Sequence, residues 1–213
     1  MRILVTGFDP FGGENINPAW EAVRALPDQI ARAQIRTLQV PTVFGDAVRV
    51  VGEAIDQHQP DAVLCVGQAG GRSAITVERV AINVDDASIA DNAGNRPIDE
   101  PVVPDGPDAY LATLPIKAMV QAIREAGLPA SVSNSAGTFV CNHLMYGVLH
   151  HLASRGTSAR GGFIHVPYIP QQTTDKPGMP SMSATDITRA LTAALEAMVT
   201  HDADIRLGDG ATH

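Results

Sequence analysis

The sequence predicts an α/β sandwich, and two observations support this. Short apolar runs of strand length alternate along the 213 residues with segments whose apolar residues recur at helical spacing. Apolar residues make up 45% of the chain and charged residues 18%, close to the averages for globular domains. We therefore expect residues 1–213 to form a single domain, with a tail at 201–213 that carries little apolar signal and frays.

The expected strands are apolar runs bounded by turn residues. Residues 61–66 are almost wholly apolar, so this strand should lie in the centre of the sheet with both faces covered. Residues 75–84 alternate and are rich in β-branched side chains, which indicates a strand or one arm of a hairpin. The remaining strands are expected at 2–6, 34–41, 130–134 and 162–166.

The expected helices are identified by their caps and by apolar residues on one face. Asn17 is a favourable N-cap and Pro18 a favourable first helical residue. Ser183 should cap the last helix in the same way. The helices are expected at 17–26, 44–58, 114–127, 141–153 and 183–199.

Charge, hydropathy and cysteine content exclude several classes of protein. Lys and Arg number 15 against 23 Asp and Glu, and the net charge of -8 repels nucleic acid and anionic lipid. No apolar run approaches the roughly 18 residues that a membrane span needs, and the opening strand turns too early for a signal peptide. Cys65 and Cys141 form neither a disulfide framework nor a CxxC pair. We expect a cytoplasmic protein with free thiols that binds neither nucleic acid nor membrane.

Cys141 is the sharpest candidate for chemistry. It follows the small-residue turn at 135–138 and enters a predicted helix, so its thiol should lie at a helix N-terminus, where the dipole lowers the pKa of a thiol. The alternative is a small buried apolar residue, which describes most intracellular cysteines. Cys65, inside a central apolar strand, fits that alternative better.

A nucleophilic cysteine needs a base, and the base needs a group that orients it. His165 ends an apolar strand, where sites of open α/β sheets assemble, although alone it is equally well read as a core histidine. Glu78 lies among β-branched residues, where a carboxylate requires a partner or exposure. It either accepts an imidazole N–H or belongs to a solvated face, paired with Arg79.

Sequence blocks in the same order and spacing resemble the pyroglutamyl peptidase I family, also called pyrrolidone-carboxylate peptidases. The resemblance extends from about residue 2 to residue 199. The blocks are GFDPFGG at 7–13, GQAGGR at 67–72 leading into ERVAIN at 78–83, SAGTFVCN at 135–142 and FIHVP at 163–167.

The resemblance implies a fold, an activity and a triad. The fold is a three-layer α/β/α sandwich with a twisted mixed central sheet, often assembled as a homotetramer. The activity is that of a cysteine exopeptidase, a thiol protease that hydrolyses the N-terminal pyroglutamyl residue from peptides through a thioester. Cys141 is then the nucleophile, His165 the acid and base, and Glu78 the orienting carboxylate. The resemblance implies no cofactor and no metal.

The resemblance also implies a pocket for the pyroglutamyl lactam. Aromatic and aliphatic walls remove water from a flat, uncharged lactam, whereas an ordinary N-terminal ammonium would be buried there without a partner. Polar groups in the pocket would pair with the lactam amide. The pocket residues carried over are Phe8, Phe11, Asn17, Gln68, Phe139 and Val140.

One departure from the family and two alternatives remain open. Ser88 stands where family members often have an arginine, which brings into question the reaction rate or the order of the polar segment at 85–106, a candidate cover for the site. The Gly-rich turn at 67–72 would also suit phosphate in a phosphorylase-like enzyme of similar architecture. The third reading is a catalytically weakened protein that binds small lactams or amides.

Overall fold

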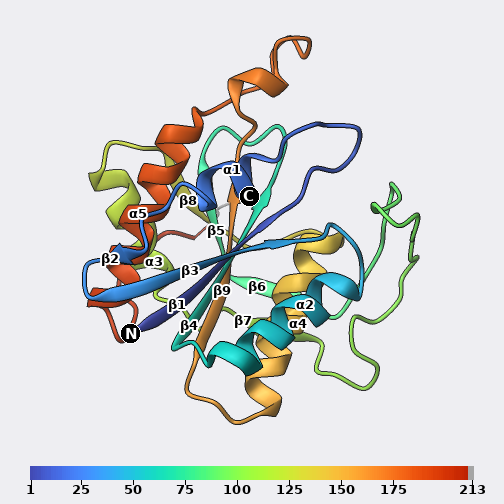
Figure 1. The fold of residues 1–213 in the computed structure, drawn as a ribbon, viewed down its shortest axis with the longest axis horizontal. Helices are drawn as coiled ribbons and strands as arrows, with labels where there is room; N and C mark the ends of the chain where they lie inside the picture. The colour runs from blue at the N-terminus through green and yellow to red at the C-terminus, as the bar shows by residue number, and fades with distance from the viewer. Residues whose placement is uncertain (211–213) are drawn as a thin grey trace.

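The computed structural model describes residues 1–210 and has the predicted three-layer α/β/α architecture (Figure 1). Its central sheet has the strand order β2-β3-β1-β4-β9-β5-β8. In chain order these strands are β1 (Arg2–Phe8), β2 (Gln29–Ile30), β3 (Ala33–Val40), β4 (Ala62–Gln68), β5 (Ile75–Glu78), β8 (Ala130–Ser133) and β9 (Arg160–Val166).

The sheet is mixed, as predicted. Strands β3, β1, β4 and β9 run parallel, so the carboxyl ends of β4 and β9 lie at the same edge. Strand β5 runs antiparallel to β9 and parallel to β8. The apolar run predicted to be central is β4, the middle strand of the order, and it is buried along nearly its whole length. Because helices cover both faces of the sheet, apolar and polar residues do not alternate along this strand.

Helices cover both faces of the sheet, each over its own apolar core. In Figure 1, α1 (Pro18–Val23), α3 (Ile116–Glu125) and α5 (Ala184–Thr200) lie on one side, and α2 (Asp46–His58) and α4 (Val140–Ser154) on the other. Both predicted caps are confirmed: Asn17 accepts from the Ala19 N–H and Ser183 from the Asp186 N–H. Within residues 1–210, no helix is long and apolar enough to cross a membrane.

The segment predicted as one strand or hairpin arm at 75–84 divides at Arg79. Its first half is β5 of the main sheet, and its second half is β6 (Val80–Ile82), which pairs with β7 (Ala109–Leu111) in a separate two-stranded sheet. Arg79 serves both sheets, because its N–H donates to the Ser133 carbonyl and its carbonyl accepts from the Ala112 N–H. β-Branched composition alone does not show such a division.

The end of the chain is held against the domain as far as residue 210. Asp204 accepts hydrogen bonds from the N–H groups of Lys117 and Ala118 at the start of α3, whose own N-cap, Pro115, has no side-chain hydrogen bond. Asp209 accepts from the Arg124 guanidinium at 2.9 Å. These bonds hold the chain at Asp204 and Asp209, while the expectation of a frayed tail at 201–213 stays a prediction, and 211–213 lie outside the described residues.

Candidate active site

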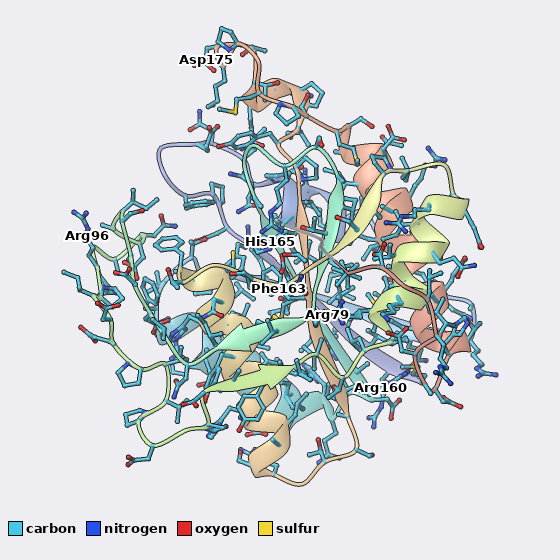
Figure 2. The ribbon with its side chains drawn as sticks, turned by 180° about the vertical axis from the view of Figure 1, so that it is seen from behind. Arg79, Arg96, Arg160, Phe163, His165 and Asp175 are labelled. Atoms are coloured by element: carbon cyan, nitrogen blue, oxygen red, sulfur yellow. The ribbon has the colours of Figure 1, made fainter. Side chains whose placement is uncertain are left out.

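The thiol of Cys141 lies at the carboxyl edge of the central strands. A Cβ atom added to Gly67 would lie 2.9 Å from the Cys141 Sγ, so the thiol rests directly on that glycine of β4. Gly67 is the register partner of His165 on β9. Because register partners on parallel strands point to the same face, Cys141 and His165 share one face and one edge of the sheet. Figure 2 shows His165 near the centre of the molecule, above Phe163 on the same strand.

Glu78 holds the imidazole of His165. The Nδ1 atom of His165 lies 2.7 Å from Oε1 of Glu78, and both side chains are buried. Thr76 is the register partner of His165 on β5, so Glu78 reaches its neighbour diagonally. Since Nδ1 donates to the carboxylate, the neutral ring carries its lone pair on Nε2. No hydrogen bond within residues 1–210 occupies Nε2, and this nitrogen is free to act as a base.

The charges of this pair suit general-base catalysis. Burial by itself raises the pKa of the Glu78 carboxyl. The hydrogen bond and charge of His165, the Ser133 hydroxyl and the hydrogen bond from Arg72 together outweigh burial and leave the pKa below its ordinary value. Burial, together with the positive charge of Arg72, lowers the pKa of His165 by more than the hydrogen bond and charge of Glu78 raise it. At neutral pH the pair is therefore a carboxylate beside a neutral imidazole, which is the form that accepts a proton from a thiol.

The pKa of the Cys141 thiol in the free protein differs from the expected one. Cys141 is only half-buried as a residue, but burial of the thiol and the negative charge of Glu78 raise its pKa to about 12, even though the positive charge of Arg72 lowers it. The expectation that the helix N-terminus would lower this pKa is therefore wrong for the free protein. A standing thiolate is not present at neutral pH, so the nucleophile must form by proton transfer to a base.

The first turn of α4 leaves backbone donors free beside the thiol. Its N-cap is Phe139, which makes no side-chain capping bond, and the first intrahelical bond of the turn runs from the His143 N–H to the Phe139 carbonyl. The N–H of Cys141 therefore has no acceptor within the helix. A helix N-terminus with free N–H groups suits an oxyanion.

Side chains on both sides of Cys141 fix this turn to the segment that follows β5. Asn142 is fully buried, accepts from the Ile82 N–H at 2.9 Å and donates to the Ile82 carbonyl at 2.9 Å. His143 Nδ1 lies 2.7 Å from Asp85, and the Thr138 hydroxyl donates to the Asp86 carbonyl. The nucleophile thus has little freedom to move, and the sequence analysis did not assign this anchoring role to Thr138, Asn142 or His143.

The predicted lactam-pocket residues fall into two groups. Phe11 and Phe139 are partly exposed and their ring centroids are 6.2 Å apart. Phe44, which the sequence analysis missed, meets Phe139 edge to face at 5.4 Å. Val140 is fully buried under them.

Phe8 lies elsewhere: it is 2% exposed and packs on Phe163, whose ring lies 4.8 Å from that of His165. Phe8 therefore supports the imidazole from the core side.

The two polar pocket residues have protein partners. Asn17 donates to the Asp9 carbonyl at 2.9 Å and caps α1, so both ends of its amide hold the loop that carries Phe11. The Oε1 atom of Gln68 accepts from Gln172 at 2.8 Å, which leaves the amide nitrogen of Gln68 for a ligand. Gln172 is buried, and the sequence analysis did not single it out.

The Gly-rich turn at 67–72 is explained by close contacts. A Cβ at Gly70 would lie 2.3 Å from the ring of Tyr168, and Gly71 has a φ of +88°. With Gly67 against the thiol, these three glycines are required by sterics. The phosphate cradle considered for this turn has no further support.

Replacing Gly67 with alanine is expected to lower kcat/KM at least about 100-fold, because the new methyl group displaces the thiol from its place beside the base. The added Cβ would also lie 2.7 Å from the Phe163 ring. The change is measured by steady-state kinetics together with thermal unfolding. Gly208→Ala, at a position with nothing within 4 Å, is the matched control. Near-normal turnover by Gly67→Ala would contradict this placement of Cys141.

Ser88 is exposed on the segment at 85–106, beside a cavity of about 630 Å³. Arg96 lines the same cavity and donates from Nε to the Ala87 carbonyl at 3.1 Å. Figure 2 places Arg96 on the outer part of this segment, away from His165. Position 88 thus lacks a positive charge, but Arg96 supplies one nearby in the same loop. Neither position lies at the triad.

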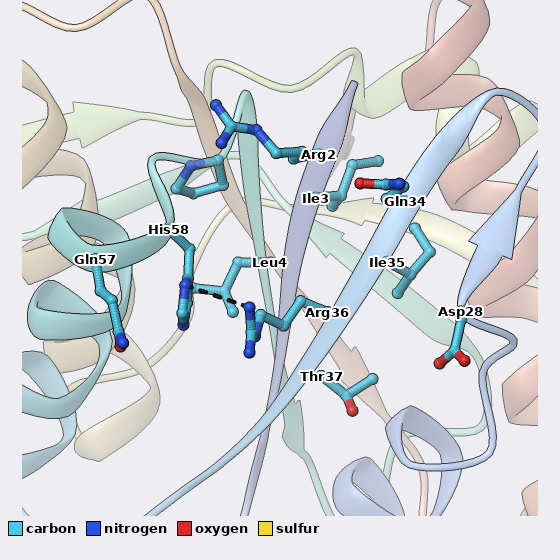
Figure 3. Close-up of a pocket in the computed structure, with 11 residues that line it drawn as sticks. Arg2, Ile3, Leu4, Asp28, Gln34, Ile35, Arg36, Thr37, Gln57 and His58 are labelled. Carbon is cyan, nitrogen blue, oxygen red and sulfur yellow. Dashed lines mark hydrogen bonds between the residues drawn. The ribbon is translucent and has the colours of Figure 1, made fainter.

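A further cavity lies at the opposite end of the sheet (Figure 3). It measures about 640 Å³ and is lined by residues at the amino ends of β1 and β3 and the carboxyl end of α2. Its cationic groups include Arg36, whose Nη1 lies 3.3 Å from Nδ1 of His58. Basic side chains at a helix C-terminus interact favourably with the helix dipole, which accounts for them without a ligand.

Comparison with known proteins agrees with this geometry. The family model for pyroglutamyl peptidases matches residues 1–201. Pyrrolidone-carboxylate peptidase of Escherichia fergusonii is 58% identical over 212 residues, covering 99% of each chain, and that of Finegoldia magna is 56% identical over the full length of both. The crystal structure of pyroglutamyl peptidase I from Bacillus amyloliquefaciens superposes with a TM-score of 0.94 at 51% identity, covering 97% of this chain and 99% of that one. A mutant pyrrolidone carboxyl peptidase from Pyrococcus furiosus gives a TM-score of 0.90 at 46% identity, with 94% and 99% coverage.

Proposed function

Since the chain belongs to the pyroglutamyl peptidase family of cysteine peptidases, we propose that it removes N-terminal pyroglutamate from peptides with Cys141, His165 and Glu78 as its triad. The observation that carries the residue assignment is the 2.7 Å bond from Glu78 to His165, whose register partner Gly67 supports the Cys141 thiol. Family membership does not favour the phosphorylase-like or the non-catalytic reading.

The first half of the reaction forms a thioester. Nε2 of His165 takes the proton of Cys141 as Sγ attacks the pyroglutamyl carbonyl carbon. The N–H of Cys141 stabilises the resulting oxyanion. The tetrahedral species then collapses, the C–N bond breaks, and the imidazolium gives its proton to the departing amine. The Glu78 carboxylate stabilises the imidazolium while it exists.

The second half releases pyroglutamate. A water molecule, deprotonated by His165, adds to the thioester carbonyl, and the C–S bond breaks. The proton returns through the imidazole to Sγ, which restores the neutral pair of thiol and histidine. One water is consumed for each peptide bond cleaved.

Specificity depends on the absence of charge on the pyroglutamyl ring nitrogen. The partly exposed rings of Phe11, Phe44 and Phe139 form an aromatic wall near the start of α4, where an ammonium group would lose its hydration without gaining an anionic partner. The free amide nitrogen of Gln68 is a donor for the lactam carbonyl.

A pyroglutamyl-coumarin amide is expected to be turned over at least about 10³-fold faster, in kcat/KM, than the glutaminyl amide, because desolvating an unpaired ammonium costs several kcal/mol. Fluorophore release under reducing conditions measures both. A prolyl-coumarin amide is the matched control, since it has the same ring size but a charged nitrogen. Comparable turnover of the glutaminyl and pyroglutamyl substrates would refute this function.

The setting of the enzyme is part of the same proposal. A cytoplasmic location is supported by the free thiols of Cys65 and Cys141, which a reducing compartment preserves. A homotetramer is supported by the family resemblance alone, and light scattering of the purified chain tests it.

A further inference from the structure

We propose that Arg72 is a positioning residue that compensates the charge of Glu78 and so keeps His165 neutral and ready to accept the thiol proton. This inference rests on the proposed triad. It concerns the residue of the Gly-rich turn whose side chain binds Glu78.

Arg72 binds the same carboxylate oxygen as the histidine. Its Nη1 donates to Oε1 of Glu78 at 2.7 Å, the atom that also lies 2.7 Å from Nδ1 of His165. The guanidinium is held in place by two further contacts, to the Thr76 hydroxyl and to the Ser135 carbonyl. A planar guanidinium fixed at three acceptors is a rigid source of positive charge.

The carboxylate has few other means of stabilisation. Glu78 is fully buried, and its second oxygen, Oε2, has no hydrogen-bond partner within the described residues. The Ser133 hydroxyl, on the neighbouring strand β8, donates to the Ser135 carbonyl at 3.1 Å. A buried carboxylate beside a neutral imidazole alone is costly. Arg72 supplies the missing countercharge.

Without that countercharge the proton distribution would change. The buried carboxylate would be balanced by a proton on His165, whose Nε2 would then be a donor and could not accept from Cys141. The charged or titratable groups that face the pair are Arg72 from the turn and Cys141 from α4, with Cys65 of β4 behind the thiol. Among them only Arg72 is permanently positive.

The direction of the pH effect follows from these charges. Arg72 lowers the pKa of His165 and that of the Cys141 thiol, and its hydrogen bond lowers the pKa of Glu78. Removing the guanidinium therefore raises all three values. Since the active form has a neutral His165 and an ionised Glu78, activity in the variant should require a higher pH than in the wild type.

The test compares Arg72→Gln with Arg72→Lys and with Arg79→Gln. In Arg72→Gln the acid limb of kcat/KM is expected to move upward by about one pH unit, with at least about a tenfold loss near pH 6 that is partly recovered near pH 8. Arg72→Lys keeps the positive charge, so the acid limb of its kcat/KM profile should stay close to that of the wild type. Arg79→Gln removes an equal charge one residue from Glu78, but this side chain donates to Asn134 at 2.8 Å and should leave the profile unchanged.

A second readout separates this inference from the peptidase assignment. The rate at which iodoacetamide alkylates Cys141, followed by mass spectrometry from about pH 5 to about pH 9, reports thiol activation without a peptide substrate. The midpoint of this profile should also rise in Arg72→Gln. An equal loss at every pH with both profiles unmoved would overturn the proposal and leave Arg72 a purely structural role. If Arg72→Gln does not fold, a wild-type profile in Arg72→Lys supports the proposal, and a shifted profile contradicts it.

Discussion

Replacing Cys141 with serine is expected to lower kcat for a pyroglutamyl-coumarin amide by about 10³-fold or more, with KM little changed. A hydroxyl is a far weaker acid and nucleophile than a thiol. The substitution preserves the size of the side chain, so the contact with Gly67 and the first turn of α4 remain. Steady-state fluorescence of coumarin release measures both constants.

Cys65→Ser is the control for this substitution. Cys65 is fully buried in β4, where burial raises the pKa of its thiol to about 12, and its register partner is Thr6. The Thr6 hydroxyl bonds the Cys65 thiol and can bond the new serine in its place. We expect this variant to keep activity within about threefold of the wild type. If Cys65→Ser were the inactive variant and Cys141→Ser the active one, the nucleophile would be misassigned.

Local chemistry in the sequence was sufficient to predict most of the fold. The uninterrupted apolar run of β4 predicted a central strand covered on both faces, because alternation is lost only when both faces are buried. Asn17 and Ser183 marked helix starts by the same side-chain hydrogen bonds that the structure shows. These signals act over a few residues, so they do not depend on the rest of the chain.

The parts that sequence reasoning missed depend on contacts between distant segments. Phe44 lies 95 positions before Phe139, and only the fold brings the rings to 5.4 Å. The two aspartates that hold the end of the chain, Asp204 and Asp209, bind backbone and side chains of α3 and its neighbours. A tail with few apolar residues was expected to fray, because the pattern carries no information about which N–H groups lack acceptors.

Arg72 lies in a motif that the sequence analysis noticed without assigning a partner to its side chain. Six positions separate it from Glu78, a local spacing, yet its target depends on the turn formed by Gly70 and Gly71. Glycine-rich turns also suit anions, which left phosphate open as an alternative. The anion that this turn binds is a carboxylate of the protein itself. Burial and the negative charge of Glu78 raise the pKa of Cys141, and the positive charge of Arg72 opposes them.

Glu78→Gln should lower kcat by about 10³- to 10⁴-fold while changing KM much less. The amide oxygen can still accept from His165 and Arg72, but the amide nitrogen takes the position of Oε2, which has no partner within residues 1–210. The variant also loses the negative charge that stabilises the imidazolium, and the charge of Arg72 then opposes protonation of the ring. Both effects act on the transition state more than on the bound substrate, so kcat should carry the loss.

Glu53→Gln is the matched control for that variant, because Glu53 is an exposed residue of α2 whose only ion pair is with Arg49 at 3.0 Å within the described residues. It should retain wild-type kcat. Thermal unfolding of both variants distinguishes loss of the fold from loss of chemistry, since an unpaired buried amide destabilises the core by about 1–3 kcal/mol. A folded Glu78→Gln enzyme with kcat within tenfold of the wild type would show that the imidazole is oriented by another group. Because Nδ1 of His165 has no other hydrogen-bond acceptor within residues 1–210, we expect the large loss.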